Sequence, residues 1–300
     1  GLDLALFDNR VELIADAYYK KTDNLLMQAS LPTYVSGLIG APWVNAGAMT
    51  NKGVEFTLNT RNILTHDFTW TSGLTFSINR NEVTKLYSES SAISGINGNE
   101  TLTYTMVGEP VGQFYGYKVI GMFKEESDFY KKDADGNFQL DEAGNRIRIA
   151  IPKGQQISKN GIWVGDYIYE DLHEDGVIDE KDRTFLGNPA PKFTFGFNNY
   201  FAYKGFDLNI FLNGSVGNKA VNLIRRTFTD PMRNSNLLKE ATDIALIGMH
   251  DPEVGDEELS NVYIVNADRA KVQRVTTSSA NDNNRISSRF IEDASYLRIK

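Results

Sequence analysis

The sequence contains no cysteine and few histidines. Its 300 residues include three histidines, His66, His173 and His250, which lie far apart and not at the short spacing of a zinc-protease helix. The absence of cysteine excludes disulfide scaffolds, thiolate metal sites and cysteine nucleophiles. A G-x-S-x-G nucleophile turn and a Walker phosphate loop are also missing. The chain is therefore not expected to be an enzyme.

Long apolar runs and an excess of basic residues are missing as well. The mean hydropathy is −0.35, and no apolar run approaches the length of about 18 residues that a transmembrane helix requires. The low hydropathy does not exclude transmembrane β-strands, because only every second residue of such a strand is apolar. Lysine and arginine total 31 against 39 acidic residues, a net charge of −8. This balance argues against nucleic acid as a partner, since phosphates would need a basic face.

Regular alternation of apolar and polar residues is the main signal that is present. The clearest example is 68–78, where Phe, Trp, Ser, Leu, Phe and Ile alternate with Thr, Gly and Ser. The same period of two occupies 11–19, 54–58, 193–203 and 206–212. Such a period indicates β-strands with one apolar and one polar face. An aromatic content of 11 % and a total of 8 prolines also favour a β-protein.

Strand length separates two β architectures. Strands of soluble proteins run about 5–6 residues and membrane-spanning strands about 9–11, whereas 68–78 and 193–203 each keep eleven residues in phase. Short turns alternate with long polar connections. The short turns are at 8–10, around 62–67 and at 204–205, and the long connections are at roughly 23–48, 80–112 and 217–287. We therefore expect an all-β fold, with antiparallel strands of a large transmembrane β-barrel (a partial barrel) and long extracellular loops.

A soluble β-sandwich shares part of this pattern. In a barrel, the Thr, Ser, Asn and Gly face would line a hydrated lumen, and the aromatic residues near strand ends would form interfacial girdles. In a sandwich, the same rings would belong to the core. The order of strands between 112 and 192 is ambiguous in either case. Helices are expected at 219–229 and 236–247, separated by Asp230 and Pro231.

An acidic loop at 171–182 has the spacing of an EF-hand calcium site. Its candidate ligands, with Gly176 at the tight turn, are Asp171, His173, Asp175, Val177 through its carbonyl, Asp179 and Asp182. His173 is a poor calcium ligand, and Asp182 stands where a glutamate is usual. The loop is therefore either a Ca²⁺ site or an acidic turn without an ion. The smaller acidic segment Asp133–Asn137 lacks the later ligands and is expected to be a β-turn.

Three tryptophans could stack on sugar rings. Trp70 is in phase with the apolar face of its strand, so lipid or core contact is the better interpretation for it. Trp43 and Trp163 fall in predicted loops and are the candidates for substrate binding. The alternative for both is an ordinary packing role.

A set of motifs follows one order over nearly the whole chain. They are NKGVE at 51–55, GEPVG at 108–112, FYGY at 114–117, GDYIYED at 165–171, DGVID at 175–179, LGNPAPKF at 186–193, FDL at 206–208, FLNGS at 211–215 and FIEDASYLRIK at 290–300. In this order they resemble the SusC/RagA type of TonB-linked outer-membrane proteins, in which an acidic D-G-x-I-D turn precedes a G-x-P-x-P strand start. The chain departs from that family at His173 and Glu174, where Asn-Gly is usual, and at Ala294, where glycine is usual.

The resemblance carries expectations about the parent protein. It implies that 1–300 are a fragment of the β-barrel domain of a TonB-dependent receptor, with the plug and N-terminal domains absent. By the same resemblance, the receptor imports a large nutrient, typically an oligosaccharide, across the outer membrane of a Gram-negative bacterium. Its partners would be a SusD-like surface lipoprotein, TonB and the lipid bilayer. The alternative is a secreted, calcium-dependent, glycan-binding β-sandwich.

Overall fold

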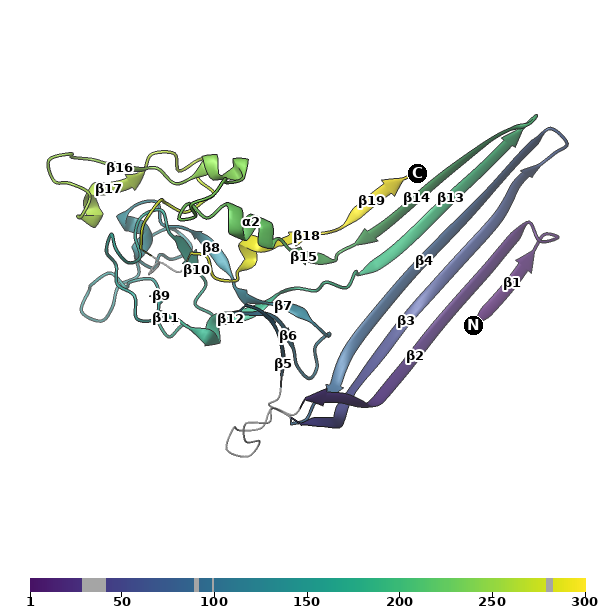
Figure 1. The fold of residues 1–300 in the computed structure, drawn as a ribbon, viewed down its shortest axis with the longest axis horizontal. Coiled ribbons are helices and arrows are strands. Elements are labelled where there is room, and N and C mark those ends of the chain that lie inside the picture. The colour runs from purple at the N-terminus through teal and green to yellow at the C-terminus, as the bar shows by residue number, and fades with distance from the viewer. Residues whose placement is uncertain (29–41, 89–91, 99, 279–282) are drawn as a thin grey trace. The chain divides into compact units, whose positions relative to one another are not determined.

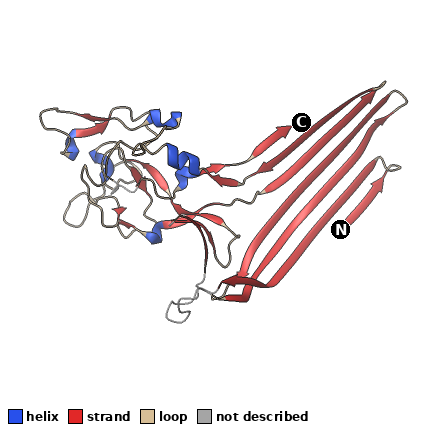
Figure 2. Cartoon of the chain, viewed as in Figure 1, coloured by secondary structure: helices blue, strands red, loops and turns tan. Residues whose placement is uncertain are grey.

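The computed structural model describes residues 1–28, 42–88, 92–98, 100–278 and 283–300. They form two compact units. The sheet unit comprises Gly1–Phe114, Gly187–Ala220 and Glu292–Lys300, and the loop unit comprises Tyr115–Leu186 and Val221–Ile291. Strands make up most of the regular structure, and the helices are short (Figure 2).

One antiparallel sheet dominates the sheet unit. Within the described residues, seven strands follow the order β1-β2-β3-β4-β13-β14-β19. They are β1 (Leu2–Leu6), β2 (Val11–Gln28), β3 (Trp43–Leu64), β4 (Phe68–Lys85), β13 (Phe193–Tyr203), β14 (Phe206–Val216) and β19 (Tyr296–Ile299). From β2 to β14 the strands run side by side as long arrows (Figure 1). Every neighbouring pair is antiparallel, which confirms the predicted all-β, antiparallel fold.

The predicted long strands are present, and three of the strands are longer than predicted. β13 covers the predicted 193–203, whereas β4 starts at Phe68 and continues to Lys85. β2 and β3 have 18 and 22 residues. The connections at 23–48 and 80–112 are therefore shorter than predicted. The reason is that backbone pairing between β3 and β4 continues beyond the point where apolar and polar residues stop alternating.

A tight turn joins β13 and β14. Lys204 and Gly205 have φ values of +46° and +88°, and the flanking residues Tyr203 and Phe206 are paired. Two successive positive φ values are typical of a type I′ turn, whose twist matches that of the flanking strands. Glycine at 205 adopts this conformation without a steric penalty. The turn predicted at 204–205 is confirmed.

The remaining strands are short. They are β5 (Ile93–Asn97), β6 (Glu100–Thr105), β7 (Gln113–Tyr117), β8 (Val119–Met122), β9 (Ile151–Pro152), β10 (Tyr167–Tyr169), β11 (Val177–Ile178), β12 (Arg183–Gly187), β15 (Lys219–Val221), β16 (Ile247–Met249), β17 (Val262–Ile264) and β18 (Ile291–Asp293). In the loop unit, β8 pairs with β10, β9 with β11 and β16 with β17. In the part of the chain that the structure describes, no helix has the length and apolar character needed to cross a membrane.

The helix predicted at 219–229 is much shorter in the structure. Only α2 (Leu223–Phe228) is α-helical. Its start is set by Asn222, whose side-chain oxygen accepts the backbone N–H of Arg225 at 2.8 Å. The residues before Asn222 form the strand β15, so the helical pattern read from the sequence begins too early.

The prediction of a helix at 236–247 is wrong. The chain forms one 3₁₀ turn there, η3 (Lys239–Asp243), and then extends into β16. Ala245 donates its backbone N–H to the carbonyl of Val272 at 2.9 Å, not to a carbonyl of the preceding turn. Tertiary pairing with a distant segment therefore overrides the local helical pattern.

The loop unit has its own hydrophobic core. Phe123 and Phe129 stack with their ring centroids 4.0 Å apart, and both are buried. Trp163 and Val164 belong to the same cluster. The cluster is completed by Ile162, Ala245, Val262 and Ile264. Irregular segments are thus held together by buried apolar side chains and not by an extended sheet.

Candidate functional site

One face of the long sheet is apolar from β1 to β19. The register places a row of side chains across successive strands: Leu4, Leu13, Leu58, Leu74, Phe197, Leu212 and Ile299. Residues two apart on a strand share a face, so the neighbouring rows carry the other apolar residues of the alternating pattern. Phe197 is 37 % and Leu208 is 55 % exposed. The sheet unit therefore presents an extended apolar surface.

A glycine on β14 leaves space for an aromatic ring of β13 on this face. Gly214 lies opposite Phe195 in the register. A Cβ at Gly214 would be 2.5 Å from Cε1 of Phe195, closer than two carbon atoms can approach. The phenylalanine ring consequently lies over the backbone of β14. The apolar face continues across this strand pair although one of the two residues has no side chain.

A hydrogen-bonded polar cluster interrupts the apolar face near its tight-turn end. Oδ1 of Asn199 accepts Oγ–H of Ser72 at 2.7 Å and Nε1–H of Trp70 at 3.1 Å. Oγ of Ser72 accepts Nδ2–H of Asn62 at 2.7 Å. The amide oxygen and the indole N–H are therefore satisfied within the cluster. Such internal pairing is the condition under which polar groups are tolerated in an apolar environment.

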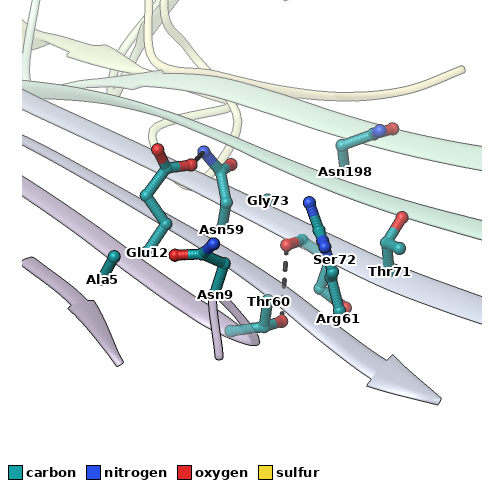
Figure 3. Close-up of a pocket in the computed structure, with 10 residues that line it drawn as sticks. All are labelled: Ala5, Asn9, Glu12, Asn59, Thr60, Arg61, Thr71, Ser72, Gly73 and Asn198. Carbon is teal, nitrogen blue, oxygen red and sulfur yellow. Dashed lines mark hydrogen bonds between the residues drawn. The ribbon is translucent and has the colours of Figure 1, made fainter. Parts of the chain in front are cut away.

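The opposite face of the sheet is polar and carries a pocket of about 600 Å³ (Figure 3). The pocket is lined by Ala5, Asn9, Glu12, Asn59, Thr60, Arg61, Thr71, Ser72, Gly73 and Asn198. The register puts Asn59, Gly73 and Asn198 in one row of the polar face. Thr60 and Ser72 belong to a row of the apolar face and only border the pocket. Oε2 of Glu12 accepts Nδ2–H of Asn59 at 3.0 Å. Glu12 and Arg61 are the charged residues of this lining, and the rest offers mainly hydroxyl and amide groups. This composition suits contact with water or with a polar solute.

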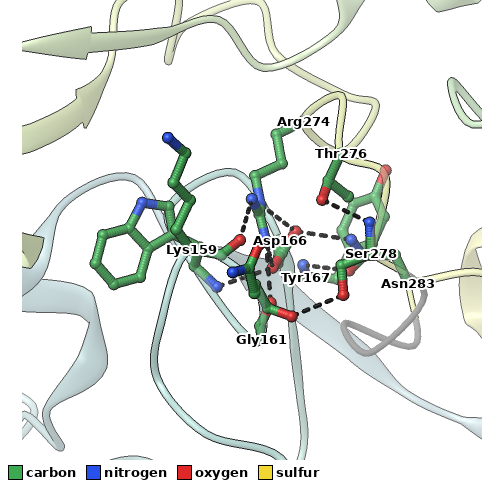
Figure 4. Close-up of polar contacts among 10 residues, drawn as sticks. Lys159, Gly161, Asp166, Tyr167, Arg274, Thr276, Ser278 and Asn283 are labelled. Atoms are coloured by element: carbon green, nitrogen blue, oxygen red, sulfur yellow. Dashed lines mark hydrogen bonds and ion pairs between the residues drawn. The ribbon is translucent and has the colours of Figure 1, made fainter. Parts of the chain in front are cut away.

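The loop unit contains a buried ion pair (Figure 4). Nε and Nη2 of Arg274 donate to Oδ1 and Oδ2 of Asp166 at 3.0 and 3.2 Å. Asp166 is 0 % and Arg274 is 4 % exposed. Oδ2 of Asp166 also accepts the backbone N–H of Trp163 at 2.8 Å, which ties the pair to the core.

Further hydrogen bonds extend this pair into a network. Arg274 donates to the carbonyls of Lys159 and Gly161 at 2.9 and 3.0 Å. Asn283 donates to Oδ1 of Asp166 at 2.8 Å and accepts the backbone N–H of Tyr167 at 3.0 Å. Burial raises the pKa of Asp166, and the guanidinium of Arg274 opposes that rise. The network fastens two loop segments that lie far apart in the sequence.

The two tryptophans proposed for substrate binding lie in different environments. Trp43 is the first residue of β3 rather than part of a loop, and it is 63 % exposed. Its ring is available to a ligand. Trp163 is 4 % exposed within the core cluster of the loop unit. Its ring is therefore enclosed in that cluster and presents no open face for stacking, so the structure does not support its candidacy.

The acidic loop at 171–182 is closed by its own hydrogen bonds. Oδ1 of the buried Asp182 accepts the backbone N–H of Leu172 at 2.9 Å, and Oδ2 accepts that of Asp179 at 2.8 Å. Asp179 in turn caps the 3₁₀ turn η2 (Glu180–Asp182) by accepting the N–H of Lys181 at 2.9 Å. These two carboxylates thus form a capping box.

Two other predicted calcium ligands accept one local hydrogen bond each. Asp171 accepts the N–H of Gly176 at 2.9 Å, and Asp175 accepts that of Val177 at 3.1 Å. Nδ1 of His173 is 3.7 Å from Oδ1 of Asp182. Among the described residues, no three His, Cys, Asp or Glu side chains form a group that could hold a metal ion. The predicted ligand set is therefore not assembled in this conformation.

The smaller acidic segment is a turn, as predicted. Oδ1 of Asp133 accepts the backbone N–H groups of Asp135 and Asn137 at 3.0 and 2.9 Å. The hydrogen bond from Asn137 contributes most to lowering the pKa of Asp133. The carboxylate acts as a turn-forming acceptor.

Two features escaped the sequence reasoning. Asp166 and Arg274 are 108 residues apart, and no local pattern distinguishes a buried charge from an exposed one. Lys52 and Arg80 continue the alternation of β3 and β4 beyond the apolar residues. Extending the period-two pattern by one more step would have identified these two cations.

Comparisons with known proteins place the chain among receptors. A family model described as TonB dependent receptor-like, beta-barrel matches residues 1–235. TonB-dependent receptors P3 and P26 of Formosa agariphila are 33 % and 30 % identical over all of this chain and 26 % of their own length. TonB-dependent receptor SusC of Bacteroides thetaiotaomicron is 25 % identical over 92 % of this chain and 25 % of its own length. The chain thus spans about a quarter of these relatives.

Solved structures share the fold. A chain in the structure of the RagAB peptide transporter aligns with a TM-score of 0.61 and 21 % identity, over 98 % of this chain and 26 % of that chain. The closed-closed state of the RagAB peptide importer gives a TM-score of 0.60 and 20 % identity over the same shares. At these identities the likeness establishes the fold alone.

Proposed function

The chain belongs to the TonB-dependent receptor-like beta-barrel family, and from this premise we propose that it supplies barrel wall and extracellular loops to a nutrient importer of a Gram-negative outer membrane. Membership of a receptor family confirms the expectation that the chain is not an enzyme. The observation that carries the proposal is the two-faced sheet, apolar on one side from β1 to β19 and polar on the other.

The height of the apolar face fits a membrane. Apolar-face positions on β4 run from Phe68 to Ile78 without a charged residue. At about 3.3 Å per residue, this stretch is roughly 33 Å long. A strand tilted by about 40° then spans roughly 25 Å along the membrane normal, which is the height of the apolar band of outer-membrane barrels.

Aromatic side chains mark the tight-turn end of the face. Trp70 and Phe201 stack with ring centroids 5.6 Å apart. Tyr203 and Phe206, on either side of the tight turn, are 52 % and 81 % exposed. Exposed rings at the end of an apolar band are typical of interfacial girdles. A secreted sandwich would bury these rings in its core, so their exposure argues against the alternative function.

The substrate and partners come from the family resemblance. We propose an oligosaccharide as the imported nutrient, a SusD-like surface lipoprotein as the lid, and TonB, acting through a part of the receptor outside this chain, as the energy source. The loop unit and the exposed Trp43 would meet the substrate on the extracellular side. The RagAB structures are of a peptide importer, so a peptide is the competing substrate class.

The test uses the full-length receptor from which this chain derives. Outer membranes are separated from the soluble fraction, and the receptor is run on a gel with and without boiling. We expect it in the outer membrane, with a folded band that shifts only after boiling. A soluble protein without such a shift would contradict the proposal. Uptake of labelled oligosaccharides and labelled peptides by cells with and without the receptor then separates the two substrate classes.

A further inference from the structure

At the strand ends away from the tight turns, the last apolar row of the sheet is followed by a row that contains two cations. One row above Ala17, Val54 and Ile78, the register aligns Tyr19, Lys52 and Arg80 on neighbouring strands. The register is regular at this point, since its irregularities lie elsewhere on these strands. The three side chains therefore lie on the same side of the sheet as the apolar rows.

Lys52 and Arg80 repel each other in this arrangement. They are direct cross-strand partners, and like charges in that position are destabilising. In the described part of the chain, neither forms an ion pair with a carboxylate. The next acid on this face, Glu82, lies one row further and is opposite Thr50. A bound anion between the two cations would remove the repulsion.

Arg80 is held in place by backbone oxygens. Its Nη1 donates to the carbonyls of Asn79 and Pro191 at 3.0 and 3.3 Å. Arg80 also lines a cavity of about 410 Å³ together with Lys192 and Lys219. No acidic residue belongs to the described lining of this cavity. A guanidinium held in place in this way suits a phosphate group.

The two lysines of the cavity are positioned by glycines. A Cβ at Gly217 would be 2.7 Å from Cγ of Lys192, and one at Gly187 would be 2.6 Å from Cγ of Lys219. The stem of each lysine therefore lies directly over a glycine backbone. Lys219 is also 3.3 Å from Asp293, so it is already paired. Lys192 comes one residue before Phe193 of the apolar face, so alternation places it on the other side of the sheet. The cations available to an anion on the apolar side are thus Arg80 and Lys52.

We propose that this cluster binds the phosphate of an anionic lipid of the outer leaflet. The phosphate would lie between Lys52 and Arg80, and the acyl chains would lie along the apolar face below them, past Val54 and Ile78. Tyr19, which is 69 % exposed, lies at the height of the headgroup, where tyrosine is favoured. The site rests on the proposed contact of this face with lipid, but it adds a specific ligand that barrel formation does not require.

The experiment measures lipid binding to the purified full-length receptor in detergent micelles. The probes are dioleoyl phosphatidic acid, dioleoylglycerol, which lacks the phosphate, and inorganic phosphate. Binding is followed by native mass spectrometry and by the melting temperature. We expect the phosphatidic acid to bind at least about tenfold more tightly than either of the other probes. Equal binding of dioleoylglycerol, or equal binding of inorganic phosphate, would overturn the proposal of a lipid-phosphate site.

Three variants make the test specific. Lys52→Gln removes a cation that makes no hydrogen bond with a described residue, and it should weaken binding of phosphatidic acid about tenfold. Lys52→Arg should retain the wild-type affinity. Lys153→Gln is the matched control, because this side chain is 74 % exposed in the loop unit. Heat-modifiability confirms that each variant is folded, so a folded Lys52→Gln variant with unchanged affinity overturns this inference without affecting the proposed barrel.

Discussion

Arg274 makes two hydrogen bonds to the fully buried carboxylate of Asp166, and this pair fastens segments 108 residues apart. Arg274→Met would leave an uncompensated buried charge, and we expect it to lower the free energy of unfolding of the loop unit by about 3–5 kcal/mol. The fluorescence of the adjacent Trp163, followed during denaturation of the full-length receptor, measures the effect.

Lys159 provides the control for this prediction. Its ammonium group pairs with the exposed Asp256 at 2.7 Å, and exposed ion pairs contribute little to stability. Lys159→Met should therefore leave the unfolding transition nearly unchanged. A similar loss of stability in both variants would contradict the role assigned to the buried pair.

Asn199 and Asn198 allow the two faces of the sheet to be compared at neighbouring positions. Asn199→Ala removes the acceptor of the Trp70 indole and the Ser72 hydroxyl on the apolar face. In lipid, the orphaned donors should cost about 1–2 kcal/mol. Asn198 belongs to the lining of the polar pocket, and its Oδ1 accepts no hydrogen bond from a described residue. Asn198→Ala should therefore have little effect. Samples are heated to increasing temperatures before the gel, and the temperature at which the folded band disappears measures the stability of each variant. Equal temperatures for the two variants would contradict the assignment of the faces.

Calcium binding at 171–182 stays a prediction of the sequence, and the hydrogen bonds of the loop give it a definite test. Because Asp182 and Asp179 already bind backbone N–H groups, we expect no rise of the melting temperature in millimolar Ca²⁺. Asp182→Ala should cost about 1–2 kcal/mol through the lost capping interaction, with or without calcium. A calcium-dependent rise in the wild type that Asp179→Asn abolishes would instead establish an ion site.

Trp43 and Trp163 should respond to substitution in opposite ways. Trp43→Ala removes an exposed ring and should weaken oligosaccharide binding about tenfold with little change in stability. Trp163→Ala empties part of the core and should cost about 3–5 kcal/mol. Calorimetric titration with the transported substrate and thermal unfolding measure the two effects. Unchanged affinity in Trp43→Ala would remove it from the substrate site.

The long sheet could be predicted because its strands follow the simplest rule of β-structure. Residues 68–78 and 193–203 alternate without a break, and each keeps one face apolar. The ends of β3 and β4 could not be predicted, because adjacent residues such as Arg80 and Asn81 make both faces polar while the backbone pairing continues. Family motifs, not periodicity, identified the receptor class, and the family match confirms them.

The secondary structure and core of the loop unit could not be predicted from the sequence for a different reason. Its structure depends on contacts between distant segments, such as the pairing of Ala245 with Val272 and of Asp166 with Arg274. The local pattern at 236–247 favours a helix, but these contacts decide the outcome. Trp163 illustrates the same point, since it lies outside regular structure, as predicted, and is still buried in the core.

In the proposed barrel, one face of β4 meets lipid and the other meets water. Because this chain has no cysteine, single cysteines can be placed at Leu74, Thr75, Phe76 and Ser77 in the full-length receptor, with any cysteine elsewhere replaced, and spin-labelled in liposomes. Labels at 74 and 76 should collide with lipid-soluble oxygen, and labels at 75 and 77 with a water-soluble nickel complex. Equal accessibility at all four positions, or the reverse alternation, would contradict the account.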